Sequence, residues 1–243
     1  MIQSSPHDEI AVLSEELPAE VEEVAQPRIV PFVLFMAFIA FESVIGWPGS
    51  AEHSLLSLWL YPVRTAVVLG SLVYLWSAYS ELRNPIIASW REGLVVVVVG
   101  VVVYAAWVRM DWSWAMQGQP TGYNPFQAGA GAAVVLAVIR IFGAAIVVPV
   151  MEELFWRSFL IRFLVKSPFS SVPLGTFSPL SFGATVILFG LEHHLWLAGM
   201  MAGVSYNLLL YYTRRLWPCI LAHAITNLIL GVHVLITGEW HWW

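Results

Sequence analysis

Long apolar runs separated by short polar connections dominate the 243-residue chain. A membrane-spanning helix needs about 20 mostly apolar residues, and runs of that kind recur from residue 29 onwards. The pattern predicts helices at 29–46, 58–79, 93–110, 128–148, 179–195, 196–213 and 216–236, and a further apolar stretch with charges at 149–166. We therefore expect an all-α fold, a polytopic membrane helix bundle of about 7–8 transmembrane helices.

Composition agrees with a membrane protein. Apolar residues make up 59% of the chain, charged residues 11%, and the mean hydropathy is +0.75, whereas soluble domains have about a quarter charged residues. The 16 acidic residues outnumber the 11 Lys and Arg, so nucleic acid is not an expected partner. The single cysteine, Cys219, excludes an internal disulfide, and any bound metal must use His and carboxylate ligands.

The distribution of charge divides the chain. Residues 1–28 are rich in acidic side chains and contain no Lys or Arg before Arg28, which predicts a disordered cytoplasmic tail. We expect N-terminal transmembrane helices in 29–127, a second helix bundle in 128–236, and an aromatic C-terminal end in 237–243.

The positive charges also predict an orientation. If the predicted spans alternate in direction, one side of the membrane receives Arg28, Arg83, Arg91, Arg162, Lys166, Arg214 and Arg215. Arg109 is then alone on the other side, together with the polar connection 111–127. Positive charge favours the cytoplasmic side, so the N-terminus is predicted to be cytoplasmic.

Ionisable side chains inside spanning segments are costly and are functional candidates by default. Here they gather in the C-terminal half of the chain. The clusters are Glu152, Glu153 and Arg157 in VVPVMEELFWRSFLIRF, Glu192, His193 and His194 in LFGLEHHLWLAG, and His223 and Asn227 in CILAHAITNLILG. A purely structural network would not need so many carboxylates and histidines, so we favour a shared site.

Helical spacing predicts which groups face each other. Residues four apart lie on one face of a helix, so Glu153 is expected to pair with Arg157, and His223 to stand above Asn227. Neighbouring residues on a helix point about 100° apart. Only one of two adjacent histidines can therefore face the cluster.

A buried carboxylate with two histidines and an amide supports two kinds of hydrolysis. Glu152 can act as a general base on water while imidazole and amide groups stabilise the developing oxyanion. Alternatively, Glu152, His193 and His223 can be ligands of a divalent metal such as zinc. The chain lacks the His-Glu-x-x-His helix of many zinc peptidases, so we favour metal-free catalysis and keep zinc as the alternative.

The motifs Glu-Glu-x-x-x-Arg from Glu152, Phe-x-x-x-His ending at His193 and His-x-x-x-Asn from His223 to Asn227 occur in that order. This arrangement resembles the CAAX protease and bacteriocin-processing family of intramembrane endopeptidases, over about 128–236. The resemblance implies a CAAX-protease-like catalytic helix bundle and a hydrolase. It also implies that Glu152 and His193 activate water, and that His223 and Asn227 stabilise the oxyanion.

The runs VPVMEELFWRSFL, FGLEHHLWLAG, LAHAITNL and TGEWHWW look like bacterial CAAX prenyl protease-related proteins associated with exosortase systems. This closer resemblance implies a multi-pass protein of the bacterial inner membrane. Its partners would be membrane lipids and a peptide or protein substrate, a membrane-associated or C-terminal sorting peptide, rather than a prenylated protein. The alternative is a non-proteolytic membrane partner or chaperone of a sorting enzyme. A proton-coupled transporter is disfavoured because the chain has no internal repeat.

These assignments predict a geometry. Glu152, His193 and His223 should converge on one polar cavity, and His193 rather than its neighbour His194 should face it. A helix ending at 148 would leave Glu152 near the cytoplasmic surface and His193 about 20 Å deeper. We therefore expect the stretch 128–166 to be broken or strongly tilted, with Pro149 as the cause.

Overall fold

The computed structural model describes residues 19–45, 51–118 and 122–243, and within them the fold is all-helical without strands. The long helices are α2 (Ala19–Ile45), α3 (Ala51–Tyr74), α4 (Trp90–Trp107), α8 (Pro179–Leu191), α9 (Trp196–Thr213) and α10 (Leu216–Thr237). Another long helix comprises α5 (Ala130–Phe142), the π-helical η6 (Gly143–Val147), α6 (Val148–Glu153), the π-helical η7 (Leu154–Leu160) and α7 (Ile161–Phe163).

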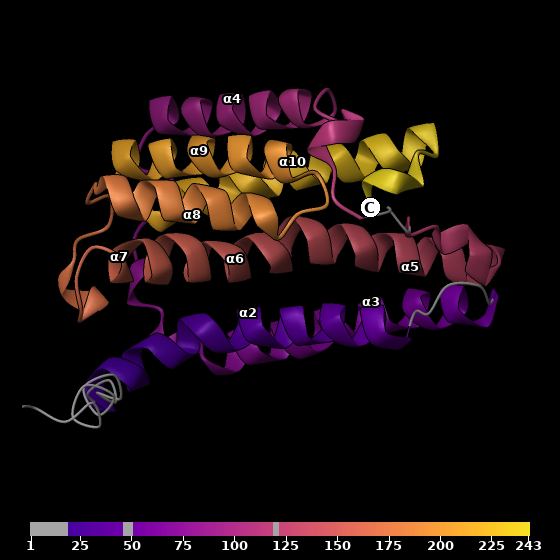
Figure 1. Ribbon diagram of the computed structural model, residues 1–243, viewed down its shortest axis with the longest axis horizontal. Coiled ribbons are helices and arrows are strands. Elements are labelled where there is room, and N and C mark those ends of the chain that lie inside the picture. The colour runs from indigo at the N-terminus through magenta and orange to yellow at the C-terminus, as the bar shows by residue number, and fades with distance from the viewer. Residues whose placement is uncertain (1–18, 46–50, 119–121) are drawn as a thin grey trace, which may run out of the picture.

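The helices lie roughly along one direction in layers (Figure 1). Helices α2 and α3 pack together on one side, the long helix from α5 to α7 runs through the middle, and α4, α8, α9 and α10 lie on the other side. Helix α2 begins at Ala19 rather than at 29. Residues 1–18 lie outside the described residues, so disorder of the acidic tail stays a prediction there.

The stretch from Ala130 to Phe163 is one uninterrupted helix of 34 residues, so the expected break at Pro149 is wrong. In η6 the Val148 N–H bonds the Gly143 carbonyl. The next such bond would need a Pro149 N–H, which proline lacks. The amide of Asn227 donates to that freed carbonyl instead, from Nδ2 to the Ala144 oxygen at 2.8 Å. A side chain from α10 thus gives this carbonyl a hydrogen-bond partner next to the proline.

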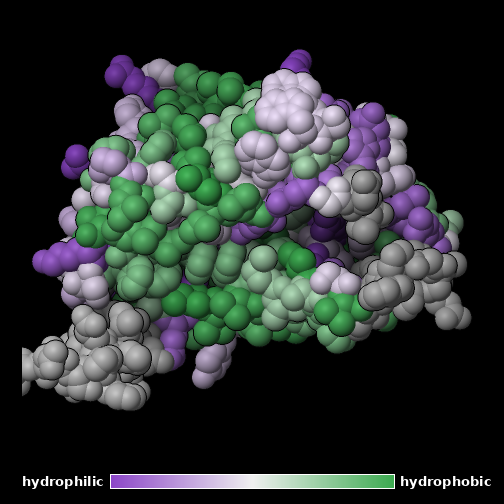
Figure 2. Space-filling model, viewed as in Figure 1, coloured by the Kyte–Doolittle hydropathy of each residue, from purple (hydrophilic) through white to green (hydrophobic). Residues whose placement is uncertain are grey.

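Four helices of the described chain are long and apolar enough to cross a membrane: Glu23–Val44, Trp90–Trp107, Ala130–Phe163 and Leu216–Thr237. The predicted count of seven or eight is not confirmed. The stretches 128–148 and 149–166 are one helix, and the apolar helices Leu58–Tyr74 and Pro179–Leu191 are shorter. Apolar side chains cover much of the face in Figure 2. The exposed apolar residues of α4 include Val97, Val98, Val101 and Val102.

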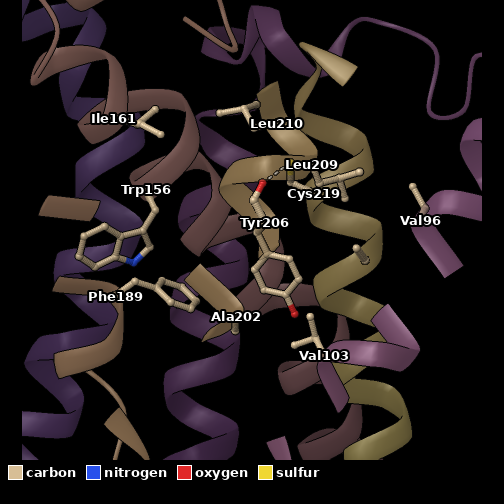
Figure 3. Packing of buried hydrophobic residues seen from close by; sticks show 11 residues of the cluster. Val96, Val103, Trp156, Ile161, Phe189, Ala202, Tyr206, Leu209, Leu210 and Cys219 are labelled. Carbon is tan, nitrogen blue, oxygen red and sulfur yellow. Dashed lines mark hydrogen bonds between the residues drawn. The ribbon is translucent and has the colours of Figure 1, made fainter. Parts of the chain in front are cut away.

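A hydrophobic core joins the long helix to α4, α8, α9 and α10. In Figure 3, Trp156 and Phe189 point toward each other, and Tyr206 lies beside Ala202. The ring planes of Trp156 and Phe189 are nearly perpendicular, with centroids 5.9 Å apart. This is a favourable arrangement for aromatic pairs, and it packs the turns that carry the polar clusters against one another.

A separate buried ionic cluster lies at the end of the long helix. The guanidinium of Arg28 donates to both carboxylate oxygens of Glu81, at 2.9 and 2.6 Å. Ser158 also donates to Glu81, and Arg162 donates to the Ser158 oxygen at 2.8 Å and to the Val172 carbonyl at 3.3 Å. We name Arg28, Glu81, Ser158 and Arg162 the anchor cluster. It places Arg28 and Arg162 at the same end of the bundle, as the charge pattern predicted.

Candidate active site

The two adjacent glutamates of α6 have different surroundings. Glu153 is fully buried, and its Oε1 accepts from Arg157 Nη1 at 3.2 Å and from His223 Nδ1 at 3.0 Å. This contact confirms the predicted pairing of Glu153 with Arg157. A carboxylate oxygen that accepts hydrogen bonds from a guanidinium and an imidazole fixes the positions of both groups. Glu153 therefore holds the side chains of Arg157 and His223 in place.

Arg157 links this carboxylate to the neighbouring helices. Its Nε donates to Asn207 Oδ1 at 3.2 Å, and Asn207 Nδ2 donates to the Thr185 hydroxyl at 2.9 Å. Its guanidinium also lies 4.2 Å from the centre of the Phe189 ring, where a cation is attracted by the ring face. The side chain thus has partners on α6, α8 and α9 and is 1% exposed.

His223 of α10 is held in a defined orientation. Its ring stacks on Tyr206 with centroids 5.0 Å apart, and its Nδ1 lies next to Glu153. Because Glu153 can only accept, the Nδ1 carries the proton. Nε2 then faces the other glutamate, at 4.0 Å from Glu152 Oε2. A water molecule or a substrate oxygen placed between them can contact both groups.

The segment that carries His193 is a turn rather than a helix. Helix α8 ends at Leu191, and residues 192–195 connect it to α9, so the predicted helix 179–195 is too long. The His193 Nδ1 donates to the Phe189 carbonyl at 2.6 Å, which leaves Nε2 as a free acceptor. The spacing Phe-x-x-x-His thereby has a physical reason, since the carbonyl of Phe189 orients the imidazole.

Glu192 joins the site, although the sequence analysis treated it only as a neighbour of the motif histidine. Its Oε1 accepts from Trp156 Nε1 at 3.0 Å. Carboxylate oxygens of Glu152 and Glu192 and a ring nitrogen of His193 all lie within 4.8 Å of one another. The turn after Leu191 allows this, because side chains of successive turn residues are not forced 100° apart. The sequence signal for Glu192 was its charge within an apolar run, beside His193.

These groups surround a cavity of about 270 Å³ between α2, α3 and the C-terminal helices. Figure 2 shows a hollow with hydrophilic residues inside it. The cavity is lined by Glu152, Glu192, His193, His194, His223 and Asn227, with apolar and aromatic side chains around them. Within the described chain, the buried Glu152 Oε2 has no hydrogen-bond partner. A carboxylate oxygen without a partner beside a cavity can accept a hydrogen bond from water or substrate.

The expected difference in depth between Glu152 and His193 does not exist. The long helix ends at Phe163 and α8 begins at Pro179 near the same end of the bundle. Counted from those two residues, Glu152 lies about 16 Å along one helix and His193 about 20 Å along the other. The structure therefore brings Glu152, His193 and His223 together, and the error came from ending the helix at 148.

Asn227 and His194 line the cavity, and each already uses part of its hydrogen-bonding capacity within the protein. One amide hydrogen of Asn227 goes to the Ala144 carbonyl, which leaves the second for a ligand. His194 was expected to point away, yet it lines the cavity, and its Nδ1 donates to the Gln117 carbonyl. The buried Nε2 of His194 has no partner in the described chain.

Gln117 was missed by the sequence analysis because it lies in the loop 111–127. Its side-chain amide donates to the carbonyls of Leu191 and His193 at 2.6 and 2.8 Å, and its backbone N–H donates to the His194 carbonyl at 2.9 Å. Carbonyls at a helix end lack partners within the helix. Gln117 donates hydrogen bonds to these carbonyls, and so holds the turn that carries His193 and Glu192.

The donor set also suits a divalent metal. Glu152, Glu192 and His193 offer two carboxylates and one imidazole with ligand atoms within 4.8 Å of one another, which fits an open three-ligand site. This set differs from the predicted ligands by one residue. Glu192 replaces His223, whose Nδ1 is bonded to Glu153.

Comparison with known proteins gives one family match over part of the chain. The family model described as type II CAAX prenyl endopeptidase Rce1-like matches residues 134–229, a segment that contains the motif residues from Glu152 to Asn227. No curated protein and no solved structure matches the chain significantly. Residues 134–229 are therefore similar to the Rce1-like CAAX prenyl endopeptidase family. This family implies a CAAX intramembrane protease, and with the apolar helices it indicates a multi-pass membrane protein.

Proposed function

We propose that the protein is an intramembrane endopeptidase that hydrolyses a peptide bond of a membrane-associated or C-terminal sorting peptide. The observation that carries this proposal is the unpartnered Oε2 of Glu152, which faces a cavity between His193 and His223. The family match at residues 134–229 supports the same reaction class. Glu153 holds Arg157 and His223 through its Oε1, and Glu192 accepts from Trp156. We assign the base to Glu152, whose Oε2 lies 4.0 Å from His223 Nε2.

In the proposed reaction, Glu152 takes a proton from water, and the water oxygen attacks the carbonyl carbon of the scissile bond. The oxyanion that forms accepts hydrogen bonds from the second amide hydrogen of Asn227 and from protonated His223 Nε2. Glu153 stabilises the charge on His223 through its Nδ1. As the C–N bond breaks, the proton on Glu152 passes to the leaving amine. The free Nε2 of His193 helps to position the water.

A bound zinc ion would change the role of Glu152 from base to ligand. Glu152, Glu192 and His193 would hold it, and the metal would supply polarisation of water and of the substrate carbonyl. The proton-accepting base would then have to be a residue other than Glu152. We favour the metal-free form, because the spacing of the motifs contains no His-Glu-x-x-His helix.

We further propose that the protein resides in the bacterial inner membrane with its N-terminus in the cytoplasm, and that its substrate belongs to an exosortase sorting system. The support is the resemblance of the runs around Glu152, His193 and His223 to exosortase-associated proteins, together with the positive charges that gather at one end of the bundle. Membrane lipids surround the exposed apolar faces.

The test is cleavage of a panel of membrane-inserted sorting peptides by the purified full-length protein in lipid nanodiscs. Wild type should cleave at least one peptide at a single bond, Glu152→Ala should not, and the exposed control Glu239→Gln should cleave normally. Binding of peptides without cleavage by wild type would instead identify the non-proteolytic partner or chaperone. Stoichiometric zinc that is lost with activity on chelation, restored on addition and absent from Glu192→Gln would overturn the metal-free mechanism.

A further inference from the structure

The cavity contains a second charged group, far from the glutamates. Arg140 lines it, and its guanidinium lies 4.3 Å from the centre of the Tyr61 ring, 5.2 Å from Tyr123 and 5.7 Å from Trp243. Aromatic faces hold the guanidinium plane while leaving its N–H edge open. No acceptor for this guanidinium occurs in the described parts of the chain, and its buried Nε has no partner.

The charges near Arg140 do not balance. Glu42 is a carboxylate near Arg140, outside the cavity lining, and it accepts a hydrogen bond from Arg64 Nη1 at 3.2 Å. Among the described side chains, one carboxylate thus faces two guanidinium groups, and their sum leaves an excess positive charge beside Arg140. The opposite end of the same cavity has the carboxylates of Glu152 and Glu192. A ligand with one negative end is therefore favoured at Arg140 and disfavoured at the glutamates.

Arg140 and Glu152 share one face of the long helix. Arg140, Ala144, Val148 and Glu152 follow one another at intervals of four residues, and all four line the cavity. Twelve residues of helix correspond to about 18 Å. An extended peptide advances about 3.3 Å per residue, so about five residues separate a group held at Arg140 from a bond held at Glu152. The two residues between them have small or apolar side chains.

We propose that Arg140 binds a carboxylate of the peptide substrate and so determines which bond reaches Glu152, about five residues away. This inference rests on the proposed function. The carboxylate can come from a free C-terminus or from an acidic side chain. In either case Arg140 is a specificity-determining residue that acts through charge and distance, and it takes no part in the proton transfers.

The test separates binding from cleavage. Fluorescent apolar peptides with a free C-terminal carboxylate, with a C-terminal carboxamide, and with a carboxamide plus one internal Glu are titrated into full-length protein in nanodiscs. Glu152→Ala is used as the host so that no peptide is cut. The free-acid peptide should bind about tenfold or more tightly than the carboxamide. Restored affinity with the internal Glu would assign the site to acidic side chains instead of the C-terminus.

Substitution of the arginine then tests the assignment. In the same host, Arg140→Gln should abolish the preference for a carboxylate, whereas Arg140→Lys should retain part of it, and the exposed Arg109→Gln, which lies outside the cavity lining, should retain all of it. Melting temperatures control for loss of the aromatic contacts. Equal affinity for all three peptides, no binding of any of them, or a preference that survives Arg140→Gln would overturn the proposal. Failure of the proposed function is recognised separately, because wild type would then bind the peptides without cutting them.

Discussion

Two buried ionic groups lie along the same long helix, and they differ in how completely their polar atoms are paired. In the anchor cluster, both oxygens of Glu81 accept hydrogen bonds from Arg28, and Ser158 adds another. One helical turn or more away, at the cavity, Glu152 Oε2 is buried without a partner. Both groups remove charge from water, but only the second leaves bonding capacity unused.

The difference separates a structural role from a chemical one. Buried polar groups in folded proteins are nearly always paired, because an unpaired one costs about 1–3 kcal/mol. The anchor cluster follows this rule and ties α2, the connection after α3 and the end of the long helix together. The site departs from it at Glu152 Oε2, which the proposed reaction uses, and also at Glu153 Oε2 and His194 Nε2. Substitutions in the two groups should therefore affect different measured properties.

The largest effect is expected for Glu152→Gln. The amide keeps the size of the side chain but cannot accept a proton, so the rate of peptide hydrolysis should fall by about 10²–10⁴-fold. The melting temperature should stay the same or rise, because a buried carboxylate without a partner is removed. Turnover and thermal melting of the same preparation check both parts. Loss of activity together with unfolding would contradict the separation of roles.

Glu81→Gln should produce the opposite outcome. It leaves Arg28 and Arg162 buried beside a neutral amide, and removing one partner of a buried ion pair costs about 3–5 kcal/mol. We expect a large fall in melting temperature with nearly normal turnover per folded molecule below it. Glu239→Gln, an exposed glutamate paired with His233, is the matched control and should melt like wild type. Normal stability of Glu81→Gln would show that the anchor cluster is dispensable.

Much of this arrangement could be predicted from the apolar pattern. The runs 196–213 and 216–236 agree closely with α9 and α10, and the spacing of Glu153 and Arg157 predicted their contact. The continuity of the long helix through Pro149 could not be predicted, because the Ala144 carbonyl before the proline is bonded by Asn227 from a helix far along the sequence. The position of Glu192 depends on where α8 ends, and the apolar pattern continues through that turn without a signal.

A smaller effect should distinguish the adjacent histidines. His193→Ala removes the free Nε2 beside Glu152 and should lower turnover about a hundredfold. His194→Ala should lower it less than about tenfold, because His194 bonds the loop through Gln117 rather than Glu152 or Glu192. Steady-state rates measured at equal melting temperature check the order. Equal losses in the two variants would mean that the turn after Leu191 works as a unit and that His193 has no separate role.

The smallest effect concerns pH and again separates the two groups. Burial alone would raise the pKa of Glu81, but the hydrogen bonds and charge of Arg28, with the Ser158 hydroxyl, hold that pKa below its ordinary value of 4.5. A carboxyl whose folded-state pKa is lowered stabilises the fold above its unfolded pKa, and this contribution is lost as pH falls through the folded pKa. The melting temperature should therefore fall when the pH is lowered from 7 to below about 4.5. In Glu81→Gln, which starts from a lower melting temperature, that part of the decline should be missing. Melting curves of both proteins across this range measure the difference, and parallel declines would show that carboxyl groups outside the anchor cluster cause the acid sensitivity.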